Sequence, residues 1–148
     1  IGLCTEVYKA KNKENNEIRA IKIIKLGDVE HHLGNNFSRE EVINQLKKEI
    51  DYMKICGENN ENSIKYYESF ETKEEFAIVM ELADMNLHEF QKVYKFSRIE
   101  IYDIMSQLNN TFKIMKEKKI IHRDLKPQNI LIKCIDDERT KFIVKLCD

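Results

Sequence analysis

Residues 120–132, IIHRDLKPQNILI, place three chemically different polar side chains between two apolar segments. Asp124, Lys126 and Asn129 fall within six residues, and Pro127 keeps the stretch out of a helix interior. An acid, an ammonium and a carboxamide suit a reaction that needs a proton acceptor, a positive charge and an oxygen ligand for a metal ion. The alternative is a polar turn held together by bonds between its side chains and its backbone.

The composition is that of one ordinary globular chain. With 148 residues, of which 42% are hydrophobic, the chain is long enough to bury a core. Its 25 Lys and Arg residues nearly balance 26 Asp and Glu residues, so no strong field favours nucleic acid as a partner. No apolar run approaches the ~20 residues that a membrane-spanning helix needs, and no signal peptide opens the chain. We therefore expect no nucleic-acid partner and no membrane segment.

The spacing of the cysteines bears on the cellular location, and the chain ends bear on whether this sequence is part of a longer protein. Cys4, Cys56, Cys134 and Cys147 are widely spaced and form no C-x-x-C pair. This spacing disfavours a structural zinc site and a disulfide framework, and it favours an intracellular, cytoplasmic location. The chain begins with Ile1 rather than Met and stops abruptly, so we expect it to be a piece of a longer protein.

The first half reads as strands with one inserted helix. β-Branched and aromatic residues flank the polar turn NKENNE, which predicts a hairpin over residues 6–24. A long loop follows, and then residues 38–55 predict an amphipathic helix that opens with Ser38 and Glu41 at capping-box spacing. Residues 63–82 predict two further strands around a second polar turn.

The second half reads as helices followed by a small hairpin. Residues 86–94 predict a short helix, and a capping box at Ser97 starts a long one. Residues 130–132 and 142–146 predict two short strands. This order indicates an α+β fold that divides near residues 82–86. The long helix has its apolar residues at helical spacing: Ile101, Ile104, Met105, Leu108, Phe112 and Met115.

The polar stretch resembles the catalytic loop of eukaryotic protein kinases, H-R-D-x-x-x-x-N, in HRDLKPQN. Other matches follow the family's order along the chain. AIKII (20–24) resembles the lysine strand V-A-I-K, and LKKEIDYM (46–53) resembles the helix that carries its partner glutamate. IGLCTEV (1–7) resembles the glycine-rich loop, although Thr5 stands at its third glycine position. FAIVMELAD (76–84) resembles the strand and hinge between the two lobes.

The resemblance implies a protein-kinase-like fold in two parts. Residues 1–82 would form the N-lobe, an antiparallel β-sheet with one helix. Residues 83–148 would form the hinge and the first, mainly helical part of the C-lobe, with the catalytic loop. The activation loop and later helices are missing, so we expect this piece alone to be inactive, with Ile101, Met105 and Phe112 partly exposed.

The resemblance also implies catalytic and metal-binding roles. Asp124 and Lys126 would act on the reacting groups, and Lys22 would hold the nucleotide's phosphates while paired with Glu49. Glu49 is preferred to its acidic neighbours because it adjoins the helix's apolar face. His122 would be structural. The Mg²⁺ ligands would be Asn129 and Asp148, since VKLCD resembles the strand leading into D-F-G. The implied nucleotide-binding residues are Gly2, Val7, Ala20, Lys22, Met80, Glu81, Ala83 and Leu131.

The implied activity is transfer of the ATP γ-phosphoryl group to serine and threonine hydroxyls of a protein substrate, with Mg²⁺. Lys126 in DLKPQN carries the serine/threonine assignment, because tyrosine kinases usually have alanine and arginine in this loop. One alternative is a pseudokinase that acts as an ATP-binding or protein-interaction module, which the single glycine of the glycine-rich loop favours. Another is a small-molecule kinase of the same fold.

Overall fold

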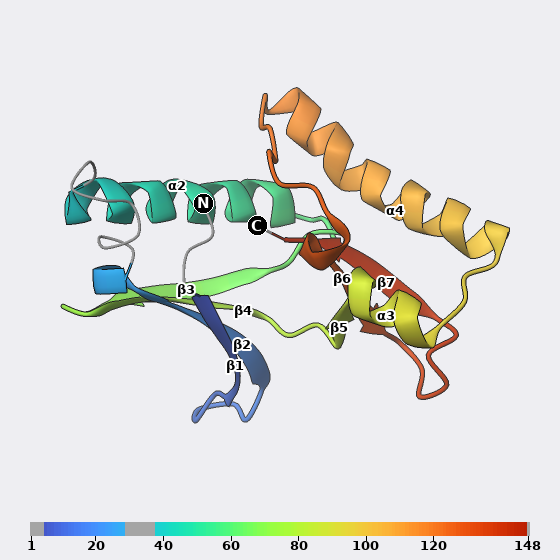
Figure 1. The fold of residues 1–148 in the computed structure, drawn as a ribbon, viewed down its shortest axis with the longest axis horizontal. Coiled ribbons are helices and arrows are strands. Elements are labelled where there is room, and N and C mark those ends of the chain that lie inside the picture. Colours follow the sequence, from blue (N-terminus) through green and yellow to red (C-terminus); the bar gives the residue numbers. More distant parts are fainter. Residues whose placement is uncertain (1–4, 29–37, 148) are drawn as a thin grey trace. The chain divides into compact units, whose positions relative to one another are not determined.

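The computed structural model describes residues 5–28 and 38–147, and these fall into two compact units. The first comprises the residues up to Asp51 together with Tyr66–Leu82, and the second comprises Tyr52–Lys65 and the residues from Ala83 onward (Figure 1). Two predicted site residues, Gly2 and Asp148, lie outside the described residues.

An antiparallel four-stranded sheet forms the first unit (Figure 1). Its strands are β1 (Thr5–Lys11), β2 (Ile18–Lys25), β3 (Tyr66–Glu71) and β4 (Glu75–Glu81), in the order β1-β2-β4-β3. Both predicted pairs of strands are confirmed, and β2 and β4 form the middle of the sheet. The five consecutive residues from Phe76 to Met80 are all buried, as befits a central strand.

The turn between β1 and β2 is built by asparagines. The Asn12 side-chain oxygen accepts a hydrogen bond from the Glu14 amide at 2.8 Å, and the Asn12 amide donates to the Glu17 carbonyl at 2.8 Å. Asn16 adopts φ 61°, a left-handed conformation that asparagine tolerates better than most residues. The NKENNE stretch therefore closes the hairpin because its residue types match the turn's backbone.

Helix α2 (Arg39–Gly57) begins at the predicted capping box. The Ser38 amide donates to the Glu41 carboxylate at 2.7 Å, and the Glu41 amide donates to Ser38 Oγ at 3.3 Å. Val42, Leu46 and Ile50, which recur at helical spacing, are buried, whereas Met53 of the same predicted face is only partly buried. At the start of the helix, the Arg39 side chain donates to the Thr72 carbonyl at 2.7 Å, which ties α2 to the turn between β3 and β4.

The second unit joins two helices to a small sheet (Figure 1). Helix α3 spans Leu87–Val93 and helix α4 spans Arg98–Glu117, both within the predicted ranges. The sheet contains β5 (Met85–Asn86), β6 (Ile130–Cys134) and β7 (Phe142–Leu146), in that order. The β6–β7 hairpin is confirmed, whereas the two-residue β5 was too short for its sequence pattern to be recognised.

One hydrophobic core unites the helices and the sheet of this unit. Its buried members are Cys56, Phe90, Ile104, Leu108, Met115, Ile130, Ile132, Phe142, Val144 and Leu146. Phe90 stands among other aromatic rings, stacked on Tyr94 at a centroid distance of 5.0 Å and edge-on to Phe96 at 5.5 Å. The core therefore fixes helix α4 and strand β6, which precede and follow the catalytic-loop sequence.

Helix α4 divides its apolar residues between two faces. Ile104, Leu108 and Met115 are buried, whereas Ile101 is 51% exposed and Met105 is 58% exposed. The expectation that these two residues are partly exposed in this chain is therefore confirmed. Phe112 is partly buried against the core.

Candidate functional site

Residues 122–129, here called the catalytic segment, form a loop whose course is set by two backbone features. Arg123 adopts φ 65°, a conformation that non-glycine residues rarely occupy and that is typical of functional sites. Residues Pro127–Asn129 form a 3₁₀ turn, in which the Asn129 amide donates to the Lys126 carbonyl at 2.9 Å. Proline suits the first position of such a turn, because it has no N–H to leave unsatisfied.

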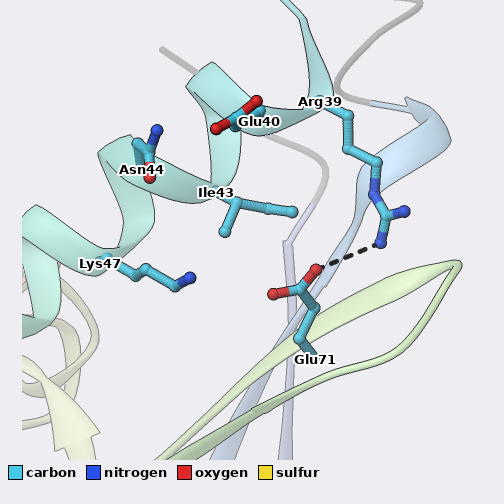
Figure 2. Close-up of a pocket in the computed structure, with 6 residues that line it drawn as sticks. All are labelled: Arg39, Glu40, Ile43, Asn44, Lys47 and Glu71. Atoms are coloured by element: carbon cyan, nitrogen blue, oxygen red, sulfur yellow. Dashed lines mark hydrogen bonds and ion pairs between the residues drawn. The ribbon is translucent and has the colours of Figure 1, made fainter.

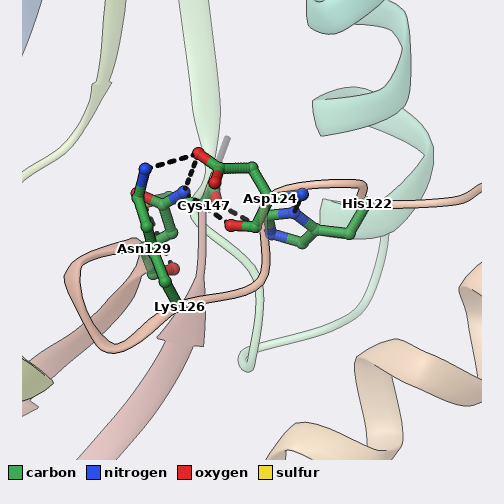
Figure 3. A network of polar contacts seen from close by, with 5 residues as sticks. All are labelled: His122, Asp124, Lys126, Asn129 and Cys147. Atoms are coloured by element: carbon green, nitrogen blue, oxygen red, sulfur yellow. Dashed lines mark hydrogen bonds and ion pairs between the residues drawn. The ribbon is translucent and has the colours of Figure 1, made fainter. Parts of the chain in front are cut away.

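Three predicted polar residues of this segment meet at one carboxylate (Figure 3). Lys126 Nζ lies 2.7 Å from Asp124 Oδ2, and Asn129 Nδ2 donates to the same oxygen at 3.0 Å. Asn129 Nδ2 also donates to the Asp124 backbone carbonyl at 2.9 Å. The segment thus makes the internal hydrogen bonds expected of a polar turn, and these bonds orient the Asp124 carboxylate.

Burial separates the supporting residue from the reactive one. Asn129 is 8% exposed, whereas the Asp124 side chain is 60% exposed. The Lys126 hydrogen bond, aided by the bond from Asn129, lowers the pKa of Asp124 below its ordinary value. Asp124 is therefore an ionised, accessible carboxylate held by a buried amide, as a proton acceptor or hydroxyl-orienting group requires.

His122 and Cys147 connect the catalytic segment to the end of β7 (Figure 3). His122 Nε2 donates to the Cys147 carbonyl at 3.1 Å, and His122 Nδ1 accepts from the Asp124 amide at 3.4 Å. These two bonds fit the neutral tautomer that carries its proton on Nε2. The Cys147 amide donates to the Asn129 carbonyl at 3.0 Å. His122 therefore has a structural role here, as expected.

The donor set suits a hard cation in part. Asn129 uses its Nδ2 group on Asp124, and no hydrogen bond among residues 5–28 and 38–147 occupies its Oδ1 atom. A neutral amide oxygen is an ordinary Mg²⁺ ligand when phosphate oxygens and waters complete the shell. The part of the chain that the structure describes contains no cluster of three or more His, Cys, Asp or Glu that could hold a metal. Asn129 thus fits a Mg²⁺ site, and the second predicted ligand, Asp148, lies outside that part and stays a prediction.

The register of the strands places four predicted nucleotide-binding residues of the first unit on one face of the sheet. Lys22 on β2 lies opposite Val7 on β1 and Ile78 on β4, and Ala20 lies opposite Met80. Directly opposed residues share a face of the sheet, and so do residues two apart on one strand. Val7, Ala20, Lys22 and Met80 therefore lie on one face in adjacent rows. Ala20 and Met80 are buried, whereas Val7 is exposed.

The remaining predicted residues are distributed between the two units. Glu49 is a partly buried residue of α2 in the first unit, and its pairing with Lys22 stays a prediction. Glu81, the last residue of β4, lies opposite Arg19. Ala83 and Leu131 belong to the second unit, where Leu131 lies opposite Asn86 on β5.

A groove of about 390 Å³ lies elsewhere in the first unit, at the start of α2 (Figure 2). Residues Arg39, Glu40, Ile43, Asn44, Lys47 and Glu71 line it. Its charges are mixed, and Arg39 is bonded to Glu71 at 3.4 Å across one end. None of the predicted site residues lines this groove, so the candidate site rests on the catalytic segment and on the Lys22 face of the sheet.

The fold and the catalytic segment define a class of protein, and comparison with known families agrees. The protein kinase domain family matches residues 1–148, and the chain belongs to that family. Its antiparallel sheet with added helices is consistent with a truncated protein-kinase-like fold.

Among known proteins, the chain is similar to several named protein kinases. It is 38% identical over 146 residues to calcium-dependent protein kinase 5 of Plasmodium berghei, covering 96% of this chain and 24% of that protein. It is 32% identical over 150 residues to human homeodomain-interacting protein kinase 4, covering 99% and 23%. It is 31% identical over 145 residues to dual specificity protein kinase YAK1 of Saccharomyces cerevisiae, covering 96% and 17%. The chain thus spans a quarter or less of the length of these relatives. Among the described residues, no helix is both long enough and apolar enough to cross a membrane.

Proposed function

We propose that this chain is the ATP-binding and catalytic-loop part of a protein kinase that phosphorylates serine and threonine hydroxyls of proteins. The observation that carries the proposal is the convergence of Lys126 and Asn129 on the exposed Asp124 carboxylate. Family membership makes ATP the expected phosphoryl donor. The use of ATP supports an intracellular location.

Asp124 orients the substrate hydroxyl and accepts its proton. The carboxylate is suited to this because it is 60% exposed and its Oδ2 atom is held in place by Lys126 and Asn129, while its lowered pKa keeps it charged to bind and orient the hydroxyl. Lys126 places an ammonium 2.7 Å from the same oxygen, where it also neutralises charge on the transferred phosphoryl group. Asn129 positions Asp124 through its buried amide and keeps its own Oδ1 for the metal.

The nucleotide-binding roles follow the face of the sheet that carries Lys22. Lys22, aligned by Glu49, holds the phosphates, and Val7, Ala20 and Met80 contact the adenine. The other residues of the nucleotide site are Gly2, Glu81, Ala83 and Leu131. Asn129 and Asp148 would hold Mg²⁺, which would neutralise charge on the phosphates. The division into an N-lobe over residues 1–82 and a partial C-lobe over residues 83–148 belongs to the same proposal.

The choice of serine and threonine rests on Lys126. An ammonium in this loop is typical of serine/threonine kinases, and its bond to Asp124 gives it a place beside the reacting hydroxyl. YAK1 is named a dual specificity kinase, so a tyrosine-containing peptide belongs in the test. We expect phosphorylation of serine and threonine peptides at a rate well above that of the tyrosine peptide.

The test is the Asp124→Asn substitution in the full-length protein, with phosphate transfer to a peptide library as the readout. We expect turnover to fall by about 10²–10⁴-fold, the usual contribution of a general base, while binding of ATP with Mg²⁺ persists. Asp137→Asn is the matched control, because Asp137 is an exposed acid in the loop between β6 and β7. It should leave turnover unchanged.

The pseudokinase alternative is favoured by the single glycine of the glycine-rich loop. It predicts that the wild-type protein transfers no phosphate to any peptide, with or without ATP binding. Turnover that is insensitive to Asp124→Asn would also contradict the enzyme proposal. Phosphorylation of small molecules without protein phosphorylation would instead favour a small-molecule kinase.

A further inference from the structure

Residues 60–64, here called the connecting segment, contain the most deeply buried polar residue of the second unit's loops. The segment lies between α2 and β3, and its Asn62 is 2% exposed. A buried carboxamide is costly unless its donors and acceptors are all used. The hydrogen bonds of Asn62 therefore indicate which parts of the structure its side chain holds together.

The backbone of the connecting segment extends the small sheet. The Leu146 amide donates to the Asn62 carbonyl at 2.9 Å, and the Ile64 amide donates to the Leu146 carbonyl at 3.0 Å. Ser63 and Leu146 form a parallel bridge. The connecting segment thus pairs with the free edge of β7 as a short parallel strand.

The side chain of Asn62 locks this pairing in one register. Asn62 Nδ2 donates to the Val144 carbonyl at 3.0 Å and to Gln107 Oε1 at 3.1 Å. The Val144 amide donates to the same Gln107 oxygen at 2.8 Å. Asn62 and Gln107 therefore engage both backbone polar groups of a single β7 residue, in addition to each other.

Further bonds hold Asn62 itself in place. Thr111 Oγ1, on a residue that is 1% exposed, donates to the Asn62 carbonyl at 2.8 Å. Asn110 Nδ2 donates to Asn62 Oδ1 at 2.9 Å, and Lys145 Nζ donates to the Glu61 carbonyl at 2.6 Å. A strand that slipped by one residue would lose these directional bonds and would turn its core side chains outward.

The register of β7 affects the catalytic segment, because β7 leads directly into Cys147, and Cys147 is hydrogen-bonded to that segment. Cys147 follows the last residue of β7, and its amide donates to the Asn129 carbonyl at 3.0 Å. Its carbonyl accepts from His122 Nε2 at 3.1 Å. A shift of β7 along its axis would therefore move Cys147 away from both His122 and Asn129.

We propose that Asn62 and Gln107 are positioning residues for the catalytic segment. They fix the register of β7, and through Cys147 they hold His122 and Asn129 where Asp124 needs them. The effect on catalysis rests on the proposed kinase function, whereas the effect on the geometry at Cys147 does not. A role confined to stability would lower the unfolding temperature without singling out Cys147.

The test uses Asn62→Asp in the full-length protein. Aspartate keeps the shape of the side chain and its Oδ1 acceptor, but it replaces the Nδ2 donor with an oxygen that faces the Val144 carbonyl and Gln107 Oε1. We expect amide hydrogen exchange at Cys147 to accelerate by about tenfold or more, as in a local opening. Exchange at Cys134, whose amide is bonded to Asp84 Oδ2 at 2.8 Å near the other end of the hairpin, should change by less than about twofold.

Asn109→Ala is the control, because Asn109 is an exposed residue of α4 that lies outside this network. Asn60 is unsuitable, because its Oδ1 accepts a hydrogen bond from the Asn62 amide at 3.1 Å and its Nδ2 donates to Thr111 Oγ1 at 3.0 Å. The Asn109→Ala variant should keep wild-type exchange at Cys147. Gln107→Met, which removes the shared acceptor from the α4 side, should accelerate exchange at Cys147 and provides the test if Asn62→Asp does not fold.

Kinetics supply the second readout. We expect Asn62→Asp to raise the Mg²⁺ concentration needed for half-maximal turnover by about tenfold, with the peptide KM nearly unchanged. Unchanged exchange at Cys147 in both Asn62→Asp and Gln107→Met would overturn the proposal. Equal acceleration in Asn109→Ala would overturn it as well. If the wild-type protein transfers no phosphate, the exchange data still decide the positioning role, and only the proposed function fails.

Discussion

The Asp124 carboxylate shows how neighbouring residues prepare a single side chain. Lys126 and Asn129 both donate to its Oδ2 atom, yet the carboxylate remains exposed enough to meet a substrate. The hydrogen bond to Lys126 is the main reason that the pKa of Asp124 is lowered. Because a lowered pKa favours the charged form, Asp124 stays ionised at a lower pH than an ordinary aspartate would.

This shift makes a prediction about Lys126→Met. Removing the ammonium takes away the main interaction that lowers the pKa of Asp124, so the pKa should rise towards its ordinary value. The acidic limb of the pH–rate profile of kcat/KM should therefore move to higher pH, and turnover at neutral pH should fall by about tenfold or more through the lost charge. Steady-state kinetics from about pH 2.5 to about pH 8 measure both effects.

Lys113→Met is the control for this prediction, since Lys113 is an exposed residue of α4 outside the catalytic segment. It should leave the profile in place. An acidic limb that stays put in Lys126→Met, or moves to lower pH, would show that Lys126 does not set the ionisation of Asp124.

Sequence reasoning reached the residues of the catalytic segment because they are close along the chain. Asp124, Lys126 and Asn129 span six residues, so almost any turn brings them together. It could not give the left-handed backbone of Arg123 or the bonds of Cys147. The first is the conformation of a single residue, for which the sequence carries no signal, and the second join residues that are 18 and 25 positions apart.

At the scale of the element, helix starts show where local chemistry is enough. Ser97 and Glu100 form the predicted capping box of α4, with the Ser97 amide donating to Glu100 at 2.7 Å and the Glu100 amide donating to Ser97 Oγ at 3.3 Å. An equivalent box at α3, formed by Asn86 and Glu89, went unrecognised as one, although Asn is as good an N-cap as Ser. The signal N-x-x-E was present in the sequence.

Ser97→Ala should lower the free energy of unfolding by about 1 kcal/mol, because the first turn of α4 loses its side-chain acceptor. Chemical denaturation of the full-length protein, followed by circular dichroism, measures the change. Ser106→Ala is the control, since Ser106 is exposed in the middle of the same helix and alanine is the better helix former there. Equal destabilisation by both variants would contradict a capping role for Ser97.

Helix α4 shows that the helical spacing of apolar residues does not by itself predict which of them are buried. Both Ile101 and Ile104 satisfy a helical spacing of apolar residues, yet only Ile104 is buried. A stripe of apolar residues predicts that the helix packs against the rest of the protein. It does not predict which edge of the stripe the neighbouring strand covers. That choice is made by β7, which packs on α4 from a distant part of the sequence.

At the scale of the whole molecule, the two hairpins of the first unit followed from local patterns, whereas the order β1-β2-β4-β3 was not predicted. Alternating residues around polar turns predicted the pairs β1–β2 and β3–β4, and the kinase resemblance placed them in one sheet. The pairing of the connecting segment with β7 was not predicted, because Asn62 and Val144 are 82 residues apart. No local pattern in residues 60–64 identifies a partner that far along the chain.

The exposed apolar residues of α4 predict how residues 1–148 behave alone. Ile101 and Met105 lie one turn apart, beside the exposed Tyr102, so copies of this chain should associate through them. The double substitution Ile101→Lys with Met105→Lys should raise the monomer fraction and leave the unfolding temperature nearly unchanged. Sedimentation velocity and a thermal melt measure the two quantities.

Ile104→Lys is the contrasting variant, because Ile104 is buried and a lysine there would disrupt the core of the second unit. It should lower the unfolding temperature and increase aggregation. A wild-type chain that is monomeric at high concentration would refute the prediction for Ile101 and Met105.

The parallel bridge between Ser63 and Leu146 has a consequence for how the chain acquires its fold. During synthesis, residues 60–64 leave the ribosome long before β7 does, so their hydrogen-bonding groups must wait for a partner made 82 residues later. Contacts of such long sequence separation form late and slowly, and an unpaired segment is open to wrong partners in the meantime. We therefore expect the second unit to be completed only after β7 has emerged, with Asn62 among the last residues to become buried.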